Sequence, residues 1–127
     1  MAPDRPDPGR PTAMQIEHTD HEGVAVLRLT GDALGGPDGS ALHDALHRVR
    51  DGGRPVQAVV DLDGVRHVNS SGLGMLIGAL TTARNTGGDL RLARVPSRAR
   101  TLLEVTQLHD VFRQFDTVDG AVASYGG

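Results

Sequence analysis

The sequence contains no cysteine and very few aromatic residues, with two phenylalanines, one tyrosine and no tryptophan among 127 residues. The absence of cysteine excludes disulfides, thiolate catalysis and cysteine-based zinc sites. The scarcity of aromatic rings argues against the stacking platforms that proteins use to bind single-stranded nucleic acids. Leucine, valine, isoleucine and alanine must therefore build the core.

The sequence also lacks a basic excess and a long apolar run. Its formal net charge is −3 and its pI is about 6.0, so we expect no direct contact with nucleic acid or an anionic membrane. The longest nearly apolar stretch, residues 72–80, is far shorter than the ~20 residues of a membrane-spanning helix. No apolar run follows the first basic residues, which predicts no signal peptide and a cytoplasmic location.

A chain of this length is expected to form one domain. Residues 1–13 hold four of the seven prolines, interspersed with aspartate and arginine. Such a segment buries too little apolar surface to offset the entropy of ordering it. We therefore predict a disordered tail over 1–13 and a folded domain over 14–125.

Strand and helix patterns alternate along the predicted domain. Strands are expected at 14–18, 24–29, 56–61, 90–95 and 111–115. Helices are expected at 40–51, 71–86, 97–106 and 118–124, with Ser40 and Ser97 as N-caps and Gly52-Gly53 ending the first. The fold class is α/β, with a mostly parallel sheet of four to five strands, an antiparallel N-terminal strand and about four helices.

The segment Val68-Asn69-Ser70-Ser71-Gly72-Leu73-Gly74 follows the third expected strand and opens a helix. Asn69, Ser70 and Ser71 are all residues that cap helix N-termini. Gly72 and Gly74 each disfavour a helix by about 1 kcal/mol relative to alanine, but small residues there let another surface approach closely. The positive end of the helix dipole favours an anion, such as a phosphate on Ser70. From the residues alone, a capped helix that has no further role is the preferred interpretation.

This segment, together with the preceding run Val59-Val60-Asp61-Leu62-Asp63-Gly64-Val65, resembles the signature of bacterial anti-sigma factor antagonists, which are STAS domains. The family pattern is hydrophobic-Asp-Leu-x-x-Val, followed by Asp-Ser-Ser-Gly-Leu-Gly. Weaker similarity extends from about residue 14 to 124. It includes Leu29-Thr30-Gly31-Asp32 and the segment 102–108, where Gln107 replaces a family glycine.

The resemblance implies a protein switch that regulates transcription indirectly and catalyses nothing. The unmodified antagonist binds an anti-sigma factor that is also a serine kinase, and it is released when that kinase phosphorylates it. A PP2C-type phosphatase then restores it. Carried to this sequence, Ser70 is the phosphoacceptor, and Asn69, Ser70, Ser71, Gly72, Leu73, Gly74 and Asp32 are the partner-binding residues. No cofactor or metal is implied, and weak homodimerisation stays open.

The sequence departs from the family pattern at two functional positions. Asn69 stands where the family has aspartate, which keeps the capping ability and removes the charge. Asp32-Ala33-Leu34 stands where the family has Glu-Leu-Asp, so the partner-binding aspartate is not clearly placed, and Asp38 is a second candidate. These departures leave open a STAS scaffold that is not phosphorylated, or a module that binds a ligand or another partner.

Two chemical alternatives come from the residues themselves. A serine hydrolase would use Ser70 or Ser71 with His67 and Asp61 or Asp63, but the G-x-S-x-G elbow is absent. A metal site would use His43 and His47, which lie four residues apart on one expected helix. No third ligand accompanies that pair in the sequence, so two solvated histidines are the preferred interpretation.

Overall fold

The computed structural model describes residues 14–33, 37–49 and 55–126. The strands are β1 (Gln15–His21), β2 (Val24–Ala33), β3 (Gln57–Val68), β4 (Asp89–Ala93) and β5 (Gln114–Phe115). The helices are α1 (Pro37–Val49), α2 (Ser70–Asn85), α3 (Ser97–Val105) and α4 (Val118–Gly126). The predicted tail at 1–13 and the predicted helix stop at Gly52-Gly53 lie outside the described residues.

The five strands form one sheet in the order β1-β2-β3-β4-β5. β1 is antiparallel to β2, and the remaining neighbours are parallel. This confirms the predicted fold class. The β1–β2 turn is formed by Glu22 and Gly23, whose φ angles of 54° and 83° suit a two-residue hairpin with both central residues in the left-handed region.

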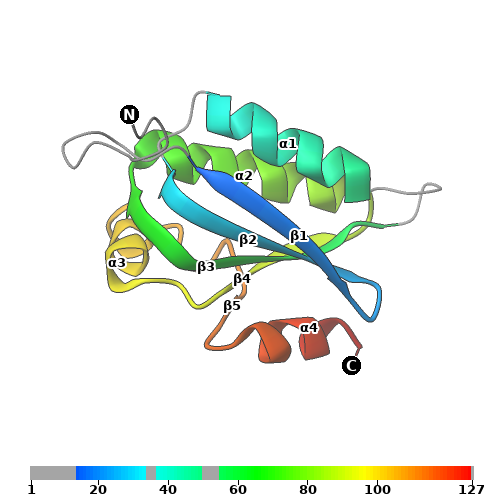
Figure 1. The fold of residues 1–127 in the computed structure, drawn as a ribbon. Coiled ribbons are helices and arrows are strands. Elements are labelled where there is room, and N and C mark those ends of the chain that lie inside the picture. Colours follow the sequence, from blue (N-terminus) through cyan, green and yellow to red (C-terminus); the bar gives the residue numbers. More distant parts are fainter. Residues whose placement is uncertain (1–13, 34–36, 50–54, 127) are drawn as a thin grey trace, which may run out of the picture.

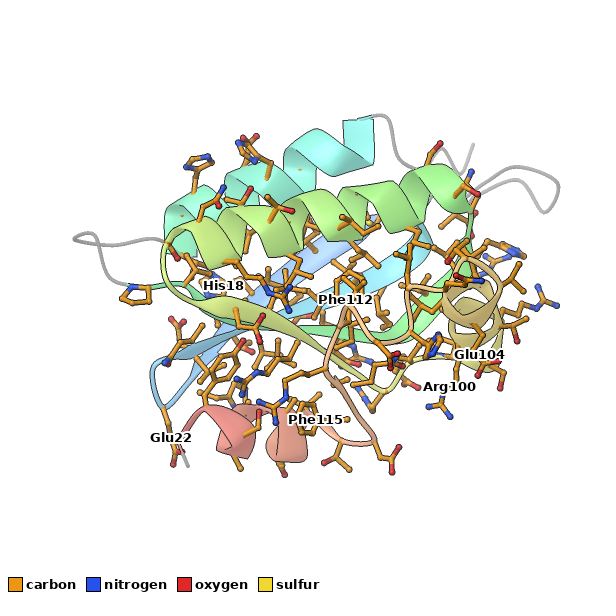
Figure 2. The ribbon with its side chains drawn as sticks, turned by 180° about the vertical axis from the view of Figure 1, so that it is seen from behind. His18, Glu22, Arg100, Glu104, Phe112 and Phe115 are labelled. Atoms are coloured by element: carbon orange, nitrogen blue, oxygen red, sulfur yellow. The ribbon has the colours of Figure 1, made fainter. Side chains whose placement is uncertain are left out.

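The helices divide between the two faces and one end of the sheet (Figure 1). α1 and α2 lie side by side on one face, α4 covers part of the other, and α3 lies at the end where β3 leads into α2. The main core, between the sheet and the α1–α2 layer, is aliphatic except for Phe112. A smaller cluster lies under α4 and includes Phe115. Figure 2 shows these two phenylalanines pointing toward opposite layers.

β3 is much longer than the sequence indicated. It was expected to end at Asp61 and give way to a loop, but the strand continues to Val68. In its second half β3 has two register irregularities against β2, one at Arg28/Thr30 and one at Gly31/Asp32. The extra residues in β3 break the alternation that would reveal a strand in the sequence. β2 likewise continues past Thr30-Gly31 to Ala33.

Several predicted helix ends are also wrong. α1 begins at Pro37, so Ser40 lies inside the helix and is not its N-cap. α3 is preceded by Pro96, which makes no side-chain capping bond, and Ser97 is the first helical residue. Val105, the last residue of α3, is 75% exposed. The strand expected over 111–115 is reduced to its last two residues.

The connection from α2 to β4 is the tightest part of the fold. Gly87 has a φ of 88°, a conformation that glycine adopts readily. A Cβ atom on Gly88 would lie only 1.8 Å from the carbonyl oxygen of Val56. The Val56 amide donates to Thr86 Oγ1 at 2.8 Å, and the Asp89 amide donates to the Val56 carbonyl at 2.9 Å. This close approach fixes the start of β3 beside the start of β4.

Candidate functional site

Asn69 sets the geometry of the α2 N-terminus. Its backbone is extended, and its side-chain oxygen Oδ1 accepts a hydrogen bond from the Gly72 amide at 2.8 Å. Its own carbonyl accepts the first helical bond, from the Leu73 amide, at 2.9 Å. Asn69 is therefore the N-cap, and α2 begins at Ser70, one residue before the start at Ser71 that the sequence predicted. The cap needs only an acceptor oxygen, which an amide supplies as well as a carboxylate.

The first turn of α2 presents small residues to solvent and apolar atoms to the core. Ser70, Ser71 and Gly74 are exposed, whereas Gly72 and Leu73 are buried. A Cβ atom on Gly74 would meet nothing within 4 Å, so packing inside the chain does not require glycine there. The outer surface of this turn therefore carries only small, mostly polar side chains, and a second molecule can approach the helix backbone closely.

Asp32 lies beside this turn, on the end of β2. It is paired in register with His67, and Ala33 is paired with Val68, the last residue of β3. Asp32 is buried, with an exposed fraction of 4%. It is thus close to the α2 N-terminus through the sheet but presents little surface. The other candidate, Asp38, is in α1, and its side chain is outside the described atoms.

A buried ion pair supports the strand that leads to this site, and the sequence interpretation missed its partner. Asp61 is 2% exposed and accepts from Arg94 Nε at 3.0 Å and Nη2 at 2.5 Å. The same carboxylate accepts from the Asp63 amide at 3.1 Å. The hydrogen bond from Arg94 to Asp61 raises the pKa of the guanidinium above its usual value. An aspartate inside an apolar run was the available signal that a cation lies opposite.

Arg94 reaches Asp61 from an unusual backbone conformation. Its φ is 52°, which is uncommon for a residue other than glycine. Its amide donates to the Phe115 carbonyl at 3.0 Å, and its Nη1 atom lies 3.5 Å from Asp63 Oδ2. Arg94 therefore connects three strands: it follows the end of β4, it binds Asp61 of β3, and it donates to Phe115 of β5. These contacts hold β3 in place at Asp61, where its pairing with β4 ends.

The geometry supports neither the serine hydrolase nor the histidine metal site. Asp61 is committed to Arg94, so it does not orient His67 as a catalytic triad would require. His43 and His47 are exposed on α1, with their Nε2 atoms 2.9 Å apart. Within residues 14–33, 37–49 and 55–126, no three or more histidine, cysteine, aspartate or glutamate side chains gather as a metal site.

Among the helices of the described residues, none is both long enough and apolar enough to cross a bilayer.

The fold and the strand-to-helix junction define a protein class. The family model for the STAS domain matches residues 15–121, and the chain belongs to the STAS domain family. It has the fold of an anti-sigma factor antagonist from Mycobacterium paratuberculosis, with 24% identity, a TM-score of 0.72, and coverage of 88% of this chain and 93% of that one.

Two further solved structures show how widely the fold is used. The Bacillus cell fate determinant SpoIIAA, in its phosphorylated form, is 17% identical with a TM-score of 0.63, covering 89% of this chain and 99% of that one. A sulfate transporter family protein from Wolinella succinogenes is 18% identical with a TM-score of 0.69, covering 84% of this chain and 87% of that one. At these identities the likeness concerns the fold.

Proposed function

We propose that this STAS domain is an anti-sigma factor antagonist that binds a serine-kinase anti-sigma factor through the first turn of α2. The observation that carries the proposal is Ser70, exposed as the first residue of α2 directly after the Asn69 cap. A kinase can reach its hydroxyl without opening the fold. The likeness to anti-sigma factor antagonists of known structure supports the choice of partner class.

Phosphorylation of Ser70 would change binding without unfolding the domain. A phosphate brings a charge of about −1.5 to −2, and the positive end of the α2 dipole stabilises an anion at this position. The folded domain therefore tolerates the modification. A partner surface closed over Ser70 and Gly74 would instead have to accommodate a bulky dianion, and the complex would dissociate. A PP2C-type phosphatase would reverse the change.

The Asn69 substitution is compatible with this cycle. The structural task of residue 69 is to accept a hydrogen bond from the Gly72 amide, and Asn69 performs it at 2.8 Å. The charge that asparagine lacks belongs to the step in which the kinase recognises or activates the hydroxyl. We therefore expect Asn69→Asp to change the rate of phosphorylation more than the affinity for the unmodified partner.

The decisive experiment is phosphorylation of the full chain by the anti-sigma kinase with ATP, followed by site mapping with mass spectrometry. The expected result is one phosphate, on Ser70, absent in Ser70→Ala and retained in Ser71→Ala. Calorimetry should show that Ser70→Asp binds the kinase at least about tenfold more weakly than wild type. Modification at another residue, or equal affinity of the two proteins, would contradict the proposal.

A matched glycine pair separates partner contact from folding. Gly74 and Gly78 both lie in α2, and a Cβ atom on either meets nothing within 4 Å. Both alanine variants should be more stable by up to about 1 kcal/mol, because alanine is the better helix former. Only Gly74→Ala should weaken partner binding, since only Gly74 lies on the first turn. Equal loss of affinity in both variants would place the interface elsewhere.

A second candidate function is a STAS domain that binds its partner without phosphorylation. Asn69 and the fold shared with a transporter-family protein favour it. Under this alternative the Gly74→Ala effect persists while the kinase leaves Ser70 unmodified.

A further inference from the structure

β1 is an edge strand of the sheet, with exposed residues along most of its length. Of the described strands, only β2 pairs with β1. Every residue from Glu17 to His21 is exposed, and we call 17–21 the edge segment. Figure 1 shows β1 at one edge of the sheet, joined to β2 by the hairpin. The outer side of such a strand offers backbone donors and acceptors to a strand of another molecule.

The hairpin determines which backbone groups of β1 point outward. His21 and Val24 flank the two-residue turn, and the residues that flank such a turn form a hydrogen-bonded pair. From there, hydrogen-bonded and non-hydrogen-bonded pairs alternate along the ladder. The amide and carbonyl groups of Ile16, His18 and Asp20 therefore point away from β2. An added strand must place its own outward-pointing residues opposite these three.

The side chains of the edge segment have opposite chemistry on the two sides of Thr19. Glu17 and His18 precede it, and Asp20 and His21 follow it. Reversing the strand direction therefore exchanges carboxylates with imidazoles. When two copies pair antiparallel about a two-fold axis at Thr19, His18 faces Asp20 of the second copy. Glu17 likewise faces His21. Because an imidazole donates a hydrogen bond to a carboxylate and adds opposite charge when protonated, the segment is complementary to itself.

Registers centred on the neighbouring residues lack this complementarity. An axis at Asp20 or at Glu17 places two carboxylates opposite each other, and like charges directly opposite are destabilising. An axis at His18 places the carboxylate of Asp20 opposite the apolar Ile16. Only the axis at Thr19 pairs acids with histidines throughout 17–21 while keeping outward-pointing backbone groups opposite one another. The segment therefore selects a second copy of this chain in one register.

The contacts within one copy are compatible with this pairing. His18 Nε2 lies 3.0 Å from Asp20 Oδ1, which holds the two side chains together on one face of β1. The imidazole has a second nitrogen and the carboxylate a second oxygen, and these atoms can bind the other copy. The residues opposite this pair in β2 are Leu27 and Ala25, which carry no charge. Residues 18 and 20 are therefore the positions at which to test the contact between copies.

We propose that this protein forms a two-fold homodimer through β1, in which the sheets of two copies join antiparallel about Thr19. Backbone groups of residues 18 and 20 supply hydrogen bonds, and the contacts of His18 with Asp20 across the axis select the register. The contacts of Glu17 with His21 are secondary, because Glu17 also lies opposite Arg28 in β2. An interface of one short strand is small, so the Kd should be on the order of 0.1–1 mM.

The dimer would leave the first turn of α2 accessible. Thr19 pairs with Val26 near the start of β2, whereas Ala33, at the other end of β2, pairs with Val68 beside that turn. The stretch of β2 from Val26 to Ala33 spans about 23 Å, since a strand rises about 3.3 Å per residue. Each copy would therefore present its own Ser70, and one dimer can bind two partner molecules. Dimerisation itself does not depend on the proposed function.

Disulfide cross-linking of the full chain tests the position of the axis, because the sequence contains no cysteine. In the dimer the two Thr19 residues form a non-hydrogen-bonded pair with Cα atoms about 4.5 Å apart, which suits a disulfide. Thr19→Cys should therefore form covalent dimers on mild oxidation. His18→Cys places the two sulfur-bearing residues about 8 Å apart at Cα, beyond disulfide range. This variant and Thr81→Cys, on the exposed face of α2, should cross-link at least about tenfold less.

Mixing two charge variants tests the contact between copies. His18→Asp places carboxylates opposite carboxylates, and Asp20→His places imidazoles opposite imidazoles. In sedimentation equilibrium, each variant alone should associate at least about tenfold more weakly than wild type, whereas an equimolar mixture should recover to within about threefold. Neither variant can form the carboxylate–imidazole bond between 18 and 20 within one copy. Recovery on mixing therefore reports the contact across the axis.

Cross-linking of Thr19→Cys above both comparison variants, together with recovery on mixing, would support the dimer. A wild-type protein that stays monomeric up to about 1 mM would overturn it. Cross-linking through Thr19→Cys no greater than through Thr81→Cys, preferential cross-linking through His18→Cys, or a mixture no tighter than its components would also overturn it. A dimer that forms while the kinase leaves Ser70 unmodified would contradict the proposed function alone, so the two proposals can fail separately.

Discussion

Tyr125 is expected to control the stability of this protein at alkaline pH. Its hydroxyl lies 2.7 Å from the Ala58 carbonyl oxygen and 2.8 Å from the Asp89 carbonyl oxygen. Ala58 is in β3 and Asp89 is in β4, so these hydrogen bonds connect α4 to both strands. The Arg91 guanidinium lies 3.8 Å from the centre of the tyrosine ring.

Burial raises the pKa of Tyr125 well above its usual value. The ionised form would also lose its proton donor and face two carbonyl oxygens. The sequence contains no lysine and no cysteine. Tyr125 is therefore the only side chain whose ordinary pKa lies between those of histidine and arginine. Above neutral pH and below the titration of arginine, Tyr125 is thus the one side chain expected to lose a proton.

The sign of the effect follows from linkage. Because the folded-state pKa is raised, the contribution of Tyr125 is fully present below the unfolded-state value of about 10. It is lost as pH rises from there toward the folded-state pKa. Each unit above about pH 10 should cost up to about 1.4 kcal/mol of unfolding free energy. At neutral pH, Tyr125→Phe should cost about 1–2 kcal/mol, because it leaves both carbonyl oxygens without their donor.

The assay is urea unfolding of wild type and Tyr125→Phe, followed by far-ultraviolet circular dichroism at about pH 7 and about pH 11. The phenylalanine variant should be less stable at neutral pH, and the difference should shrink by up to about 1.4 kcal/mol at the higher pH. Tyrosinate absorbance of the folded protein should appear only at more alkaline pH than in the unfolded chain. A difference that is independent of pH would refute the reasoning.

Two further predictions concern the backbone of the fold and its cap. Gly88→Ala should destabilise the domain by about 3 kcal/mol or prevent folding, because the new Cβ meets the Val56 carbonyl and a packed backbone cannot move away freely; a thermal midpoint equal to wild type would contradict this. Asn69→Ala should cost about 1 kcal/mol through loss of the N-cap, whereas Asn69→Asp should be at least as stable as wild type. Urea titration of the two variants checks this order, and a reversed order would count against the cap.

The periodic parts of the sequence predicted their elements well. The apolar repeat of α2, with Leu73, Leu76 and Leu80 buried, follows from local chain geometry, and so does the β1–β2 hairpin. The alternation of strands with single helices determined a mostly parallel sheet, since each crossover is right-handed. The motif at 69–74 was identified from residue types alone, because capping and glycine placement are local properties.

The sequence could not reveal contacts between residues far apart in the chain. The ion pair of Asp61 with Arg94 joins positions 33 residues apart, and the Tyr125 hydrogen bonds join positions 67 and 36 residues apart. Neither leaves a periodic pattern. The second half of β3 was mistaken for a loop because its irregular register removes the alternation of buried and exposed residues.

The segment 69–74 was determined by the sequence as a capped helix start, since a cap needs only neighbouring residues. Tertiary structure decided what surrounds it. Pairing of Ala33 with Val68 places the end of β2 beside this turn, and burial removes Asp32 from the surface. The start of α3 faces the second half of β3, beyond Asp61, where the described strand β4 no longer pairs with it. Such long-range placement depends on the packing of the whole sheet, which no local pattern encodes.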